Sequence, residues 1–137
     1  MPDPALLSRR AALGLLASAC AGLLTGASRR PRVPHPDPRP GIDASHILPP
    51  ERVAEYPDAV AAFDEARAIP GILDGLRCQC GCADRPGKRS VLSCYEEDGM
   101  ALDCEICRGV ARLAYRLHGK GRSLAEIRDA VDARYGG

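Results

Sequence analysis

The chain has 137 residues, a net charge of +1, one Phe, four Tyr and no Trp, which leaves room for one modest domain with a small core. A core of this size usually needs disulfides or a metal ion to stabilise it. No basic stripe with interleaved aromatic residues occurs, which argues against nucleic acid as a partner. The seven cysteines therefore become the main guide to function.

Residues 1–27 have the pattern of an export signal. Arg9 and Arg10 precede an apolar run that ends at Leu24, so this segment resembles a twin-arginine signal and is shorter than the ~20 apolar residues of a spanning helix. Two processing sites remain open: a lipobox-like sequence that would acylate Cys20, and a signal-peptidase site ending at Ala27. Both place the protein outside the cytoplasm, in the periplasm or cell envelope. Acylated Cys20 would tether it to the membrane, and an uncleaved N-terminal anchor is a further alternative.

Residues 28–50 are rich in proline. Proline prevents helix formation and favours an extended, solvated chain, so this segment is predicted to be a linker. His35 and His46 within it are expected to be solvated rather than to bind a ligand.

Residues 51–137 are predicted to form an all-α domain, a small compact bundle of three to four short helices with a cysteine-rich loop. Apolar residues recur at helical spacing, Pro57 begins a first helix, and Ser123 with Glu126 forms a capping box for the last. One further turn of helix is expected near Cys94. The side chains expected to be buried are Tyr56, Ala59, Val60, Phe63, Ala66, Ile72, Leu73, Leu76, Ile106, Val110, Leu113, Leu117, Leu124, Ile127, Val131 and Tyr135.

The sequence Cys78-Gln79-Cys80-Gly81-Cys82 crowds three thiols into five residues. Cysteines two positions apart are not expected to bridge each other without strain. Gly81 permits a positive φ, which would curl the three thiols towards one point. This geometry favours a soft cation bound by thiolates.

A second group of cysteines is expected at the start of the long helix. Asp103 is the predicted N-cap, and the helix runs to about His118. Cys104 and Cys107 then share one side of the first turn, where the helix dipole favours thiolates. The turn-rich segment between the two groups is long enough to bring Cys94 between them.

The chain resembles the bacterial PCYCGC-motif proteins over residues 55–137. The matching residues are Tyr56-Pro57, Val60, Pro70-Gly71-Ile72-Leu73, Cys78-Gln79-Cys80-Gly81-Cys82, Cys94, Cys104-Glu105-Ile106-Cys107 and Ser123-Leu124-Ala125-Glu126-Ile127-Arg128. Many members of that family are predicted lipoproteins of unknown function, so the resemblance implies an envelope protein and assigns no activity.

Four positions depart from that family's pattern. Arg77 and Gln79 replace the Pro and Tyr of the motif, and Lys88 and Met100 stand where the family often has His. A mechanism that needs those histidines is therefore in doubt. The thioether of Met100 would suit Cu(I), which makes Met100 an additional candidate ligand, although it could equally fill a gap in the core.

Three interpretations of the function remain open. The favoured one is a non-enzymatic, exported metal-binding protein that stores, scavenges or delivers copper(I), with zinc as the second choice because few histidines lie nearby. Its predicted ligands are Cys78, Cys80, Cys82, Cys94, Cys104 and Cys107. The first alternative is a disulfide-stapled structural or partner-binding module, in which six cysteines allow 15 pairings. The other is a thiol-disulfide redox protein that uses Cys104 and Cys107.

Overall fold

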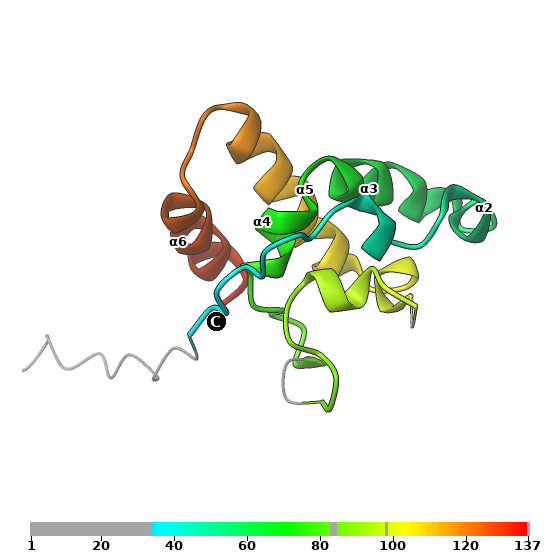
Figure 1. The fold of residues 1–137 in the computed structure, drawn as a ribbon, viewed down its shortest axis with the longest axis horizontal. Coiled ribbons are helices and arrows are strands. Elements are labelled where there is room, and N and C mark those ends of the chain that lie inside the picture. The colour runs from blue at the N-terminus through cyan, green and yellow to red at the C-terminus, as the bar shows by residue number, and fades with distance from the viewer. Residues whose placement is uncertain (1–33, 83–84, 98, 137) are drawn as a thin grey trace, which may run out of the picture. The chain divides into compact units, whose positions relative to one another are not determined.

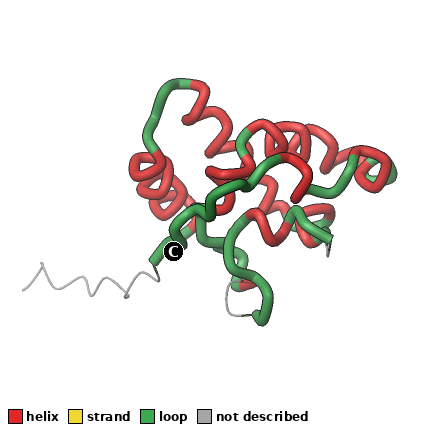
Figure 2. Tube along the Cα trace, in the orientation of Figure 1, coloured by secondary structure: helices red, strands yellow, loops and turns green. Residues whose placement is uncertain are grey.

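The computed structural model describes residues 34–82, 85–97 and 99–136. The predicted export signal, Cys20 and the first residues of the predicted linker lie outside this part of the chain. The described residues contain helices and no strand, which confirms the all-α prediction (Figures 1 and 2). The α-helices are α2 (Pro50–Val53), α3 (Pro57–Ala68), α4 (Pro70–Asp74), α5 (Glu105–Gly119) and α6 (Leu124–Tyr135), and the 3-10 helices are η2 (Ala44–His46), η4 (Leu92–Cys94) and η5 (Met100–Leu102). None of the helices in these ranges is long and apolar enough to cross a membrane.

The centre of the domain is the packing of α5 between α3 and α6 (Figure 1). The buried face of α3 consists largely of alanine with one large residue, Phe63. The buried face of α5 likewise contains Ala111 and Ala114 beside Val110. Small side chains on facing surfaces allow two helix axes to approach closely.

The buried faces of α3 and α5 differ from those predicted. Tyr56, Val60 and Ile106 are 37%, 38% and 40% exposed, so the prediction that they line the core is wrong. Alanines occupy the contact between the two helices, and larger neighbours a fraction of a turn away are rotated towards solvent. The prediction for α6 is confirmed, because Ile127 and Val131 are fully buried and the capping box at its start is present.

Residues 34–47 form an N-terminal strap along the domain. This finding differs from the prediction of a solvated linker over residues 28–50, since Ile47 and Leu48 are buried in the core. The strap is held through its backbone: Arg128 donates to the carbonyl of Pro36 at 2.7 Å, and Arg89 donates to that of Asp37. Proline-rich chain forms few backbone hydrogen bonds of its own, so arginines of the domain satisfy its carbonyls.

Arg39 fixes the middle of the strap to Asp74 at the end of α4. The backbone N–H of Arg39 donates to Asp74 Oδ2 at 2.7 Å, and its guanidinium donates to Oδ1 at 2.8 Å. Arg89 and the hydroxyl of Ser90 also contact Asp74 Oδ1, at 2.9 and 3.2 Å. The Asp74 side chain is fully buried, and these partners compensate its charge. Burial raises the pKa of Asp74, but the hydrogen bonds from Arg39 outweigh it and leave the pKa below its usual value.

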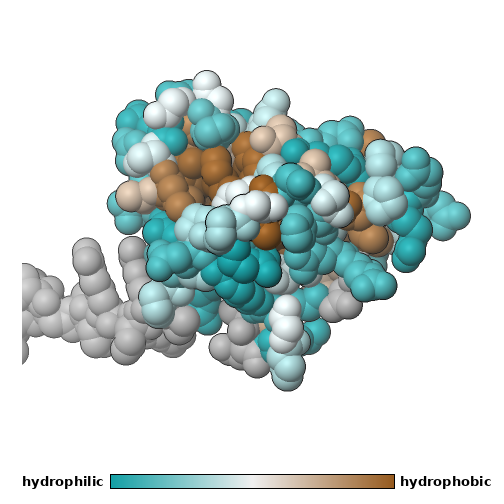
Figure 3. Space-filling view, viewed as in Figure 1, coloured by the Kyte–Doolittle hydropathy of each residue, from teal (hydrophilic) through white to brown (hydrophobic). Residues whose placement is uncertain are grey.

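Apolar side chains gather on the face between α6 and α4 (Figure 3). A shallow groove there is lined by strap and helix residues that include Pro38, Ile42, Ile72 and Leu124. The cysteine-rich loop leaves the end of α4 and passes towards the start of α5 (Figure 1).

Candidate metal centre

The loop that carries three cysteines, residues 78–82, turns sharply at Gly81. Gly81 has a φ of 79°, a left-handed conformation that favours glycine, as predicted. Cys80 and Cys82 form a disulfide, and their Cα atoms lie 5.5 Å apart. The turn at Gly81 brings their Cα atoms into the usual range for a disulfide, so these two cysteines bridge, which the sequence did not predict.

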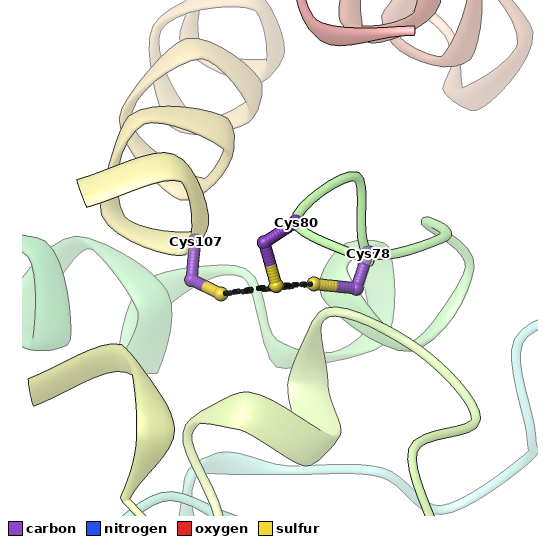
Figure 4. Close-up of side chains that lie close together, drawn as sticks. All are labelled: Cys78, Cys80 and Cys107. Atoms are coloured by element: carbon purple, nitrogen blue, oxygen red, sulfur yellow. Dashed lines mark hydrogen bonds between the residues drawn. The ribbon is translucent and has the colours of Figure 1, made fainter. Parts of the chain in front are cut away.

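Cysteines from three separate segments meet beside this disulfide. Cys78 Sγ lies 3.1 Å from Cys80 Sγ, 3.6 Å from Cys107 Sγ and 3.5 Å from Cys94 Sγ. Cys107 Sγ also lies 3.7 Å from Cys80 Sγ. Figure 4 shows Cys107 reaching from the start of α5 towards Cys78 and Cys80 on the loop, with the three sulfur atoms facing one another.

Two groups of three sulfur atoms result, and each could hold a metal ion. One consists of Cys78, Cys80 and Cys107, and the other of Cys78, Cys82 and Cys94, with the sulfur atoms of a group within 4.8 Å of one another. Cys78 belongs to both groups. All of these cysteines except Cys80 are buried.

Backbone and tyrosine contacts position Cys94 and Cys107, the two cysteines of the cluster that do not belong to the loop. The N–H of Val91 donates to the carbonyl of Leu76 at 2.8 Å, which joins the start of η4 to the chain just before Cys78. Tyr95, directly after Cys94, is fully buried and packs against Phe63 with ring centroids 4.7 Å apart and the ring planes tilted by 58°. Its hydroxyl donates to the carbonyl of Cys107 at 3.1 Å. This tyrosine therefore fixes η4 and α5 relative to each other.

Cys104 has a different role from the other five domain cysteines. It is the N-cap of α5, and its Sγ accepts a hydrogen bond from the N–H of Cys107 at 3.4 Å. The predicted N-cap was Asp103, so the helix begins one residue later than expected. Cys104 is absent from both three-sulfur groups found among the described residues.

One negative charge is concentrated on Cys78. Hydrogen bonds from the thiols of Cys107 and Cys94 lower the pKa of Cys78 to about 3, while its burial acts in the opposite direction. The hydrogen bond to Cys78 raises the pKa of Cys107 well above its usual range. For Cys94, the contact with Cys107 lowers the pKa, but the bond to Cys78 and burial outweigh it and raise the pKa to about 12. The hydrogen bonds among these sulfur atoms therefore favour a thiolate at Cys78 over one at Cys94 or Cys107.

Lys88 is a buried basic residue beside this site, and the sequence did not predict this role. Its side chain is only 8% exposed, and its Nζ donates to the carbonyl of Ser93 at 3.1 Å, next to Cys94. Its positive charge contributes to the lowered pKa of Cys78. No periodicity marks this residue, because it lies in a loop. It stands where the resembling family often has His, which was the only signal available.

The strap and α6 brace the loop from outside. His35 Nδ1 accepts a hydrogen bond from the N–H of Arg77 at 2.8 Å, and Gln79 Nε2 donates to Asp132 Oδ1 at 2.9 Å. The same Asp132 oxygen lies 3.1 Å from His35 Nε2. His35 is therefore a structural residue beside the thiol loop, whereas the sequence predicted it to be solvated.

The chemistry of this donor set fits a thiophilic ion. A metal bound by thiolates at about 2.3 Å separates its sulfur ligands by about 4 Å, close to the contacts of Cys78 with Cys94 and Cys107. The one disulfide spans two positions and the other four described cysteines are free. The described cysteines therefore do not form the set of three disulfides that would staple the helices together. Met100, in η5, is partly buried against the core, and its role as an additional ligand stays a prediction.

The fold and site define a small all-helical protein with a buried cysteine cluster that could bind metal. The family model described as "Protein of unknown function with PCYCGC motif" matches residues 42–137, and the chain belongs to this family. Searches of curated proteins and of solved structures returned no match.

Proposed function

We propose that this chain is an exported protein of the cell envelope, without enzymatic activity, that binds a soft metal ion on its cysteine cluster and handles copper(I). The observation that carries the proposal is the convergence of five cysteines from the loop, η4 and α5 in a mostly buried cluster. Thiols from distant segments rarely meet without a role, and soft thiolate ligands select ions such as Cu(I) and Zn²⁺.

Copper(I) is favoured over zinc by the number and type of donors. Structural zinc sites hold four ligands in a tetrahedron, whereas each group here offers three sulfur atoms. The groups contain no histidine or carboxylate, and a set of sulfur atoms alone suits the softer ion. Storage, scavenging and delivery are the roles this site would support.

The test is to produce the full-length chain in a reducing cytoplasm and purify it without oxygen or chelator. Elemental analysis and a count of thiols protected from alkylation then measure the cluster. Copper bound to the chain with protected thiols is the expected result. One zinc ion per chain, without copper, would support metal binding and contradict the assignment to copper. A chain that retains neither copper nor zinc would contradict the proposal as a whole.

Export is tested separately by the intact mass of the protein recovered from its native envelope. A chain that begins at Ser28 is expected for a soluble form, and an acylated Cys20 for a tethered one. A mass that retains Met1 would contradict export with processing.

Thiol-disulfide exchange is the second candidate function. The observation that favours it is the 3.1 Å separation between Cys78 Sγ and the disulfide-bonded Cys80 Sγ. A thiolate so placed can attack a disulfide. Reduction of a small disulfide substrate by the metal-free protein, lost in Cys78→Ser, would support this candidate.

A further inference from the structure

The Cys80–Cys82 disulfide joins the two three-sulfur groups. Cys80 belongs to the group with Cys107, and Cys82 belongs to the group with Cys94. A cysteine binds a metal as a thiolate, so a single disulfide removes one ligand from each group at once. Each group then retains only Cys78 and one other cysteine, Cys107 in the first group and Cys94 in the second.

We infer that this disulfide gates the site: reduction completes two three-thiolate groups that share Cys78, so that two soft monovalent ions bind. The reverse exchange, in which an external disulfide is reduced to a dithiol while the Cys80–Cys82 bond re-forms, releases them. The inference rests on the proposed function, because it describes how the same cysteines are made available. Cys78 is the bridging ligand in this arrangement, since it is the member common to both groups.

The different burial of Cys80 and Cys82 determines which sulfur atom of the disulfide a reductant attacks. Cys80 is partly exposed, whereas Cys82 is 4% exposed. An external dithiol therefore reaches Cys80 first. One of its thiolates attacks Cys80 Sγ, the Cys80–Cys82 bond breaks, and Cys82 leaves as a thiolate inside the buried group.

The second half of the reaction returns the other ligand. The remaining thiolate of the dithiol attacks its own sulfur in the mixed disulfide, which closes a cyclic disulfide and releases Cys80 as a thiolate. Two electrons pass from the dithiol to the protein, and the two protons of the dithiol go to solvent. The freed ligands lie beside Cys78, because Cys78 Sγ is already 3.1 Å from Cys80 Sγ.

The charge around the site matches this sequence of events. Reduction adds negative charge in a buried place, which is costly unless it is compensated. Lys88, at 8% exposure, contributes a positive charge next to Cys78. Two monovalent cations add two more positive charges as they displace the protons of Cys94 and Cys107 to solvent.

The experiment compares two preparations of the full-length chain. One is reduced with dithiothreitol and freed of it anaerobically; in the other, peptide mass spectrometry confirms the Cys80–Cys82 disulfide. Both are titrated with Cu(I) against a chromogenic chelator. The reduced chain should bind two Cu(I), and the disulfide form should bind at least tenfold more weakly.

Single variants separate the two groups. Cys80→Ser leaves the Cys78, Cys82 and Cys94 group complete, and Cys82→Ser leaves the Cys78, Cys80 and Cys107 group complete. Each variant, kept anaerobic, should bind one Cu(I) whether or not it has first been treated with dithiothreitol and freed of it. Its helical circular dichroism should match that of the wild type. If a variant does not fold, differential alkylation of the wild type decides, because metal should protect Cys80 and Cys82 only after reduction.

The outcomes distinguish the two claims. Failure of the reduced wild type to bind any Cu(I) would contradict the proposed function itself. Equal binding by the reduced and disulfide forms would overturn the gate while leaving metal binding intact. One Cu(I) in the reduced wild type, or two in Cys80→Ser, would overturn the sharing of Cys78 between two ions.

Discussion

His35 Nε2 donates a hydrogen bond to Asp132 Oδ1 at 3.1 Å, which joins residues separated by 97 positions. The ring can do so because its Nδ1 already accepts from the N–H of Arg77, which leaves the proton of the neutral imidazole on Nε2. The strap, the thiol loop and α6 therefore meet at one carboxylate. The position of Cys78, next to Arg77, depends on this junction.

Removal of this carboxylate should loosen the thiol loop. We expect Asp132→Ala to lower the free energy of unfolding by about 1–3 kcal/mol, because the polar groups of His35 and Gln79 lose their acceptor. Chemical unfolding followed by circular dichroism measures the change. Asp129→Ala, at an exposed position of the same helix, is the matched control and should change stability by less than about 0.5 kcal/mol. An equal loss in the two variants would contradict a specific role for Asp132.

The same junction should make stability depend on pH. Burial lowers the pKa of His35, against the opposing effect of Asp132, and Arg128 and Arg77 lower it further. The unfolded chain therefore binds more protons than the folded chain once the pH falls below about 6.5. Stability contributed by neutral His35 is present above that pH and is lost as the pH falls through the lower folded-state pKa.

Urea unfolding of the wild type and His35→Gln between pH 8 and pH 5 measures this dependence. The advantage of the wild type should shrink as the solution is acidified. A constant difference between wild type and His35→Gln across this range would contradict the prediction.

Local signals in the sequence predicted where the helices lie, but the face that each helix buries depends on the helices packed against it. Ser123 and Glu126 form a capping box by themselves, and Pro57 sets the first turn of α3, so both helix starts could be predicted. Val60 has the right spacing for the core and is exposed. The contact between α3 and α5 is made largely by alanines. Ala59 and Ala66 of α3 were predicted from their spacing, whereas Ala111 and Ala114 of α5 were not, because their small size is informative only when both helices are known.

The candidate site was predictable to a similar degree. The spacing of Cys78, Cys80 and Cys82 indicated a turn at Gly81, and the structure places these residues with Cys94 and Cys107. The bridge between Cys80 and Cys82 was not foreseen, because it depends on how far Gly81 bends the chain. Asp74 gave a signal that was missed: a carboxylate within an apolar run implies a buried partner, and Arg39 supplies it.

Asp74 should hold the strap on the domain. Asp74→Asn removes the charge that Arg39 and Arg89 compensate, and both guanidinium groups are partly exposed and can return to water. We therefore expect a loss of about 1–3 kcal/mol in unfolding free energy, together with faster proteolysis within residues 34–47. Asp64→Asn removes an exposed partner of Arg67 and should cost less than about 1 kcal/mol. Intact protease resistance of the strap in Asp74→Asn would count against this anchoring role.

Lys88 should support metal affinity by compensating negative charge at the cluster. We expect Lys88→Met to weaken Cu(I) binding by about tenfold or more, the usual effect of removing a residue that supports metal ligands. Lys120→Met removes the same charge at an exposed position after α5 and serves as the control. Competition titrations of the reduced proteins give both affinities. Equal losses of Cu(I) affinity in the two variants would mean that affinity depends on the net charge of the protein alone, and would contradict a specific role for Lys88.

Cys104 and Cys107 should respond differently to replacement by serine, although the sequence predicts that both bind metal. Cys107→Ser removes a sulfur of one three-sulfur group, so the reduced chain should bind fewer Cu(I). Cys104→Ser should keep the wild-type metal content, because Cys104 acts as the N-cap of α5. Serine is among the preferred N-cap residues, so thermal stability should be equal or slightly higher. Elemental analysis and thermal unfolding of the two variants measure both properties. Loss of metal from Cys104→Ser as large as from Cys107→Ser would restore Cys104 to the ligand set.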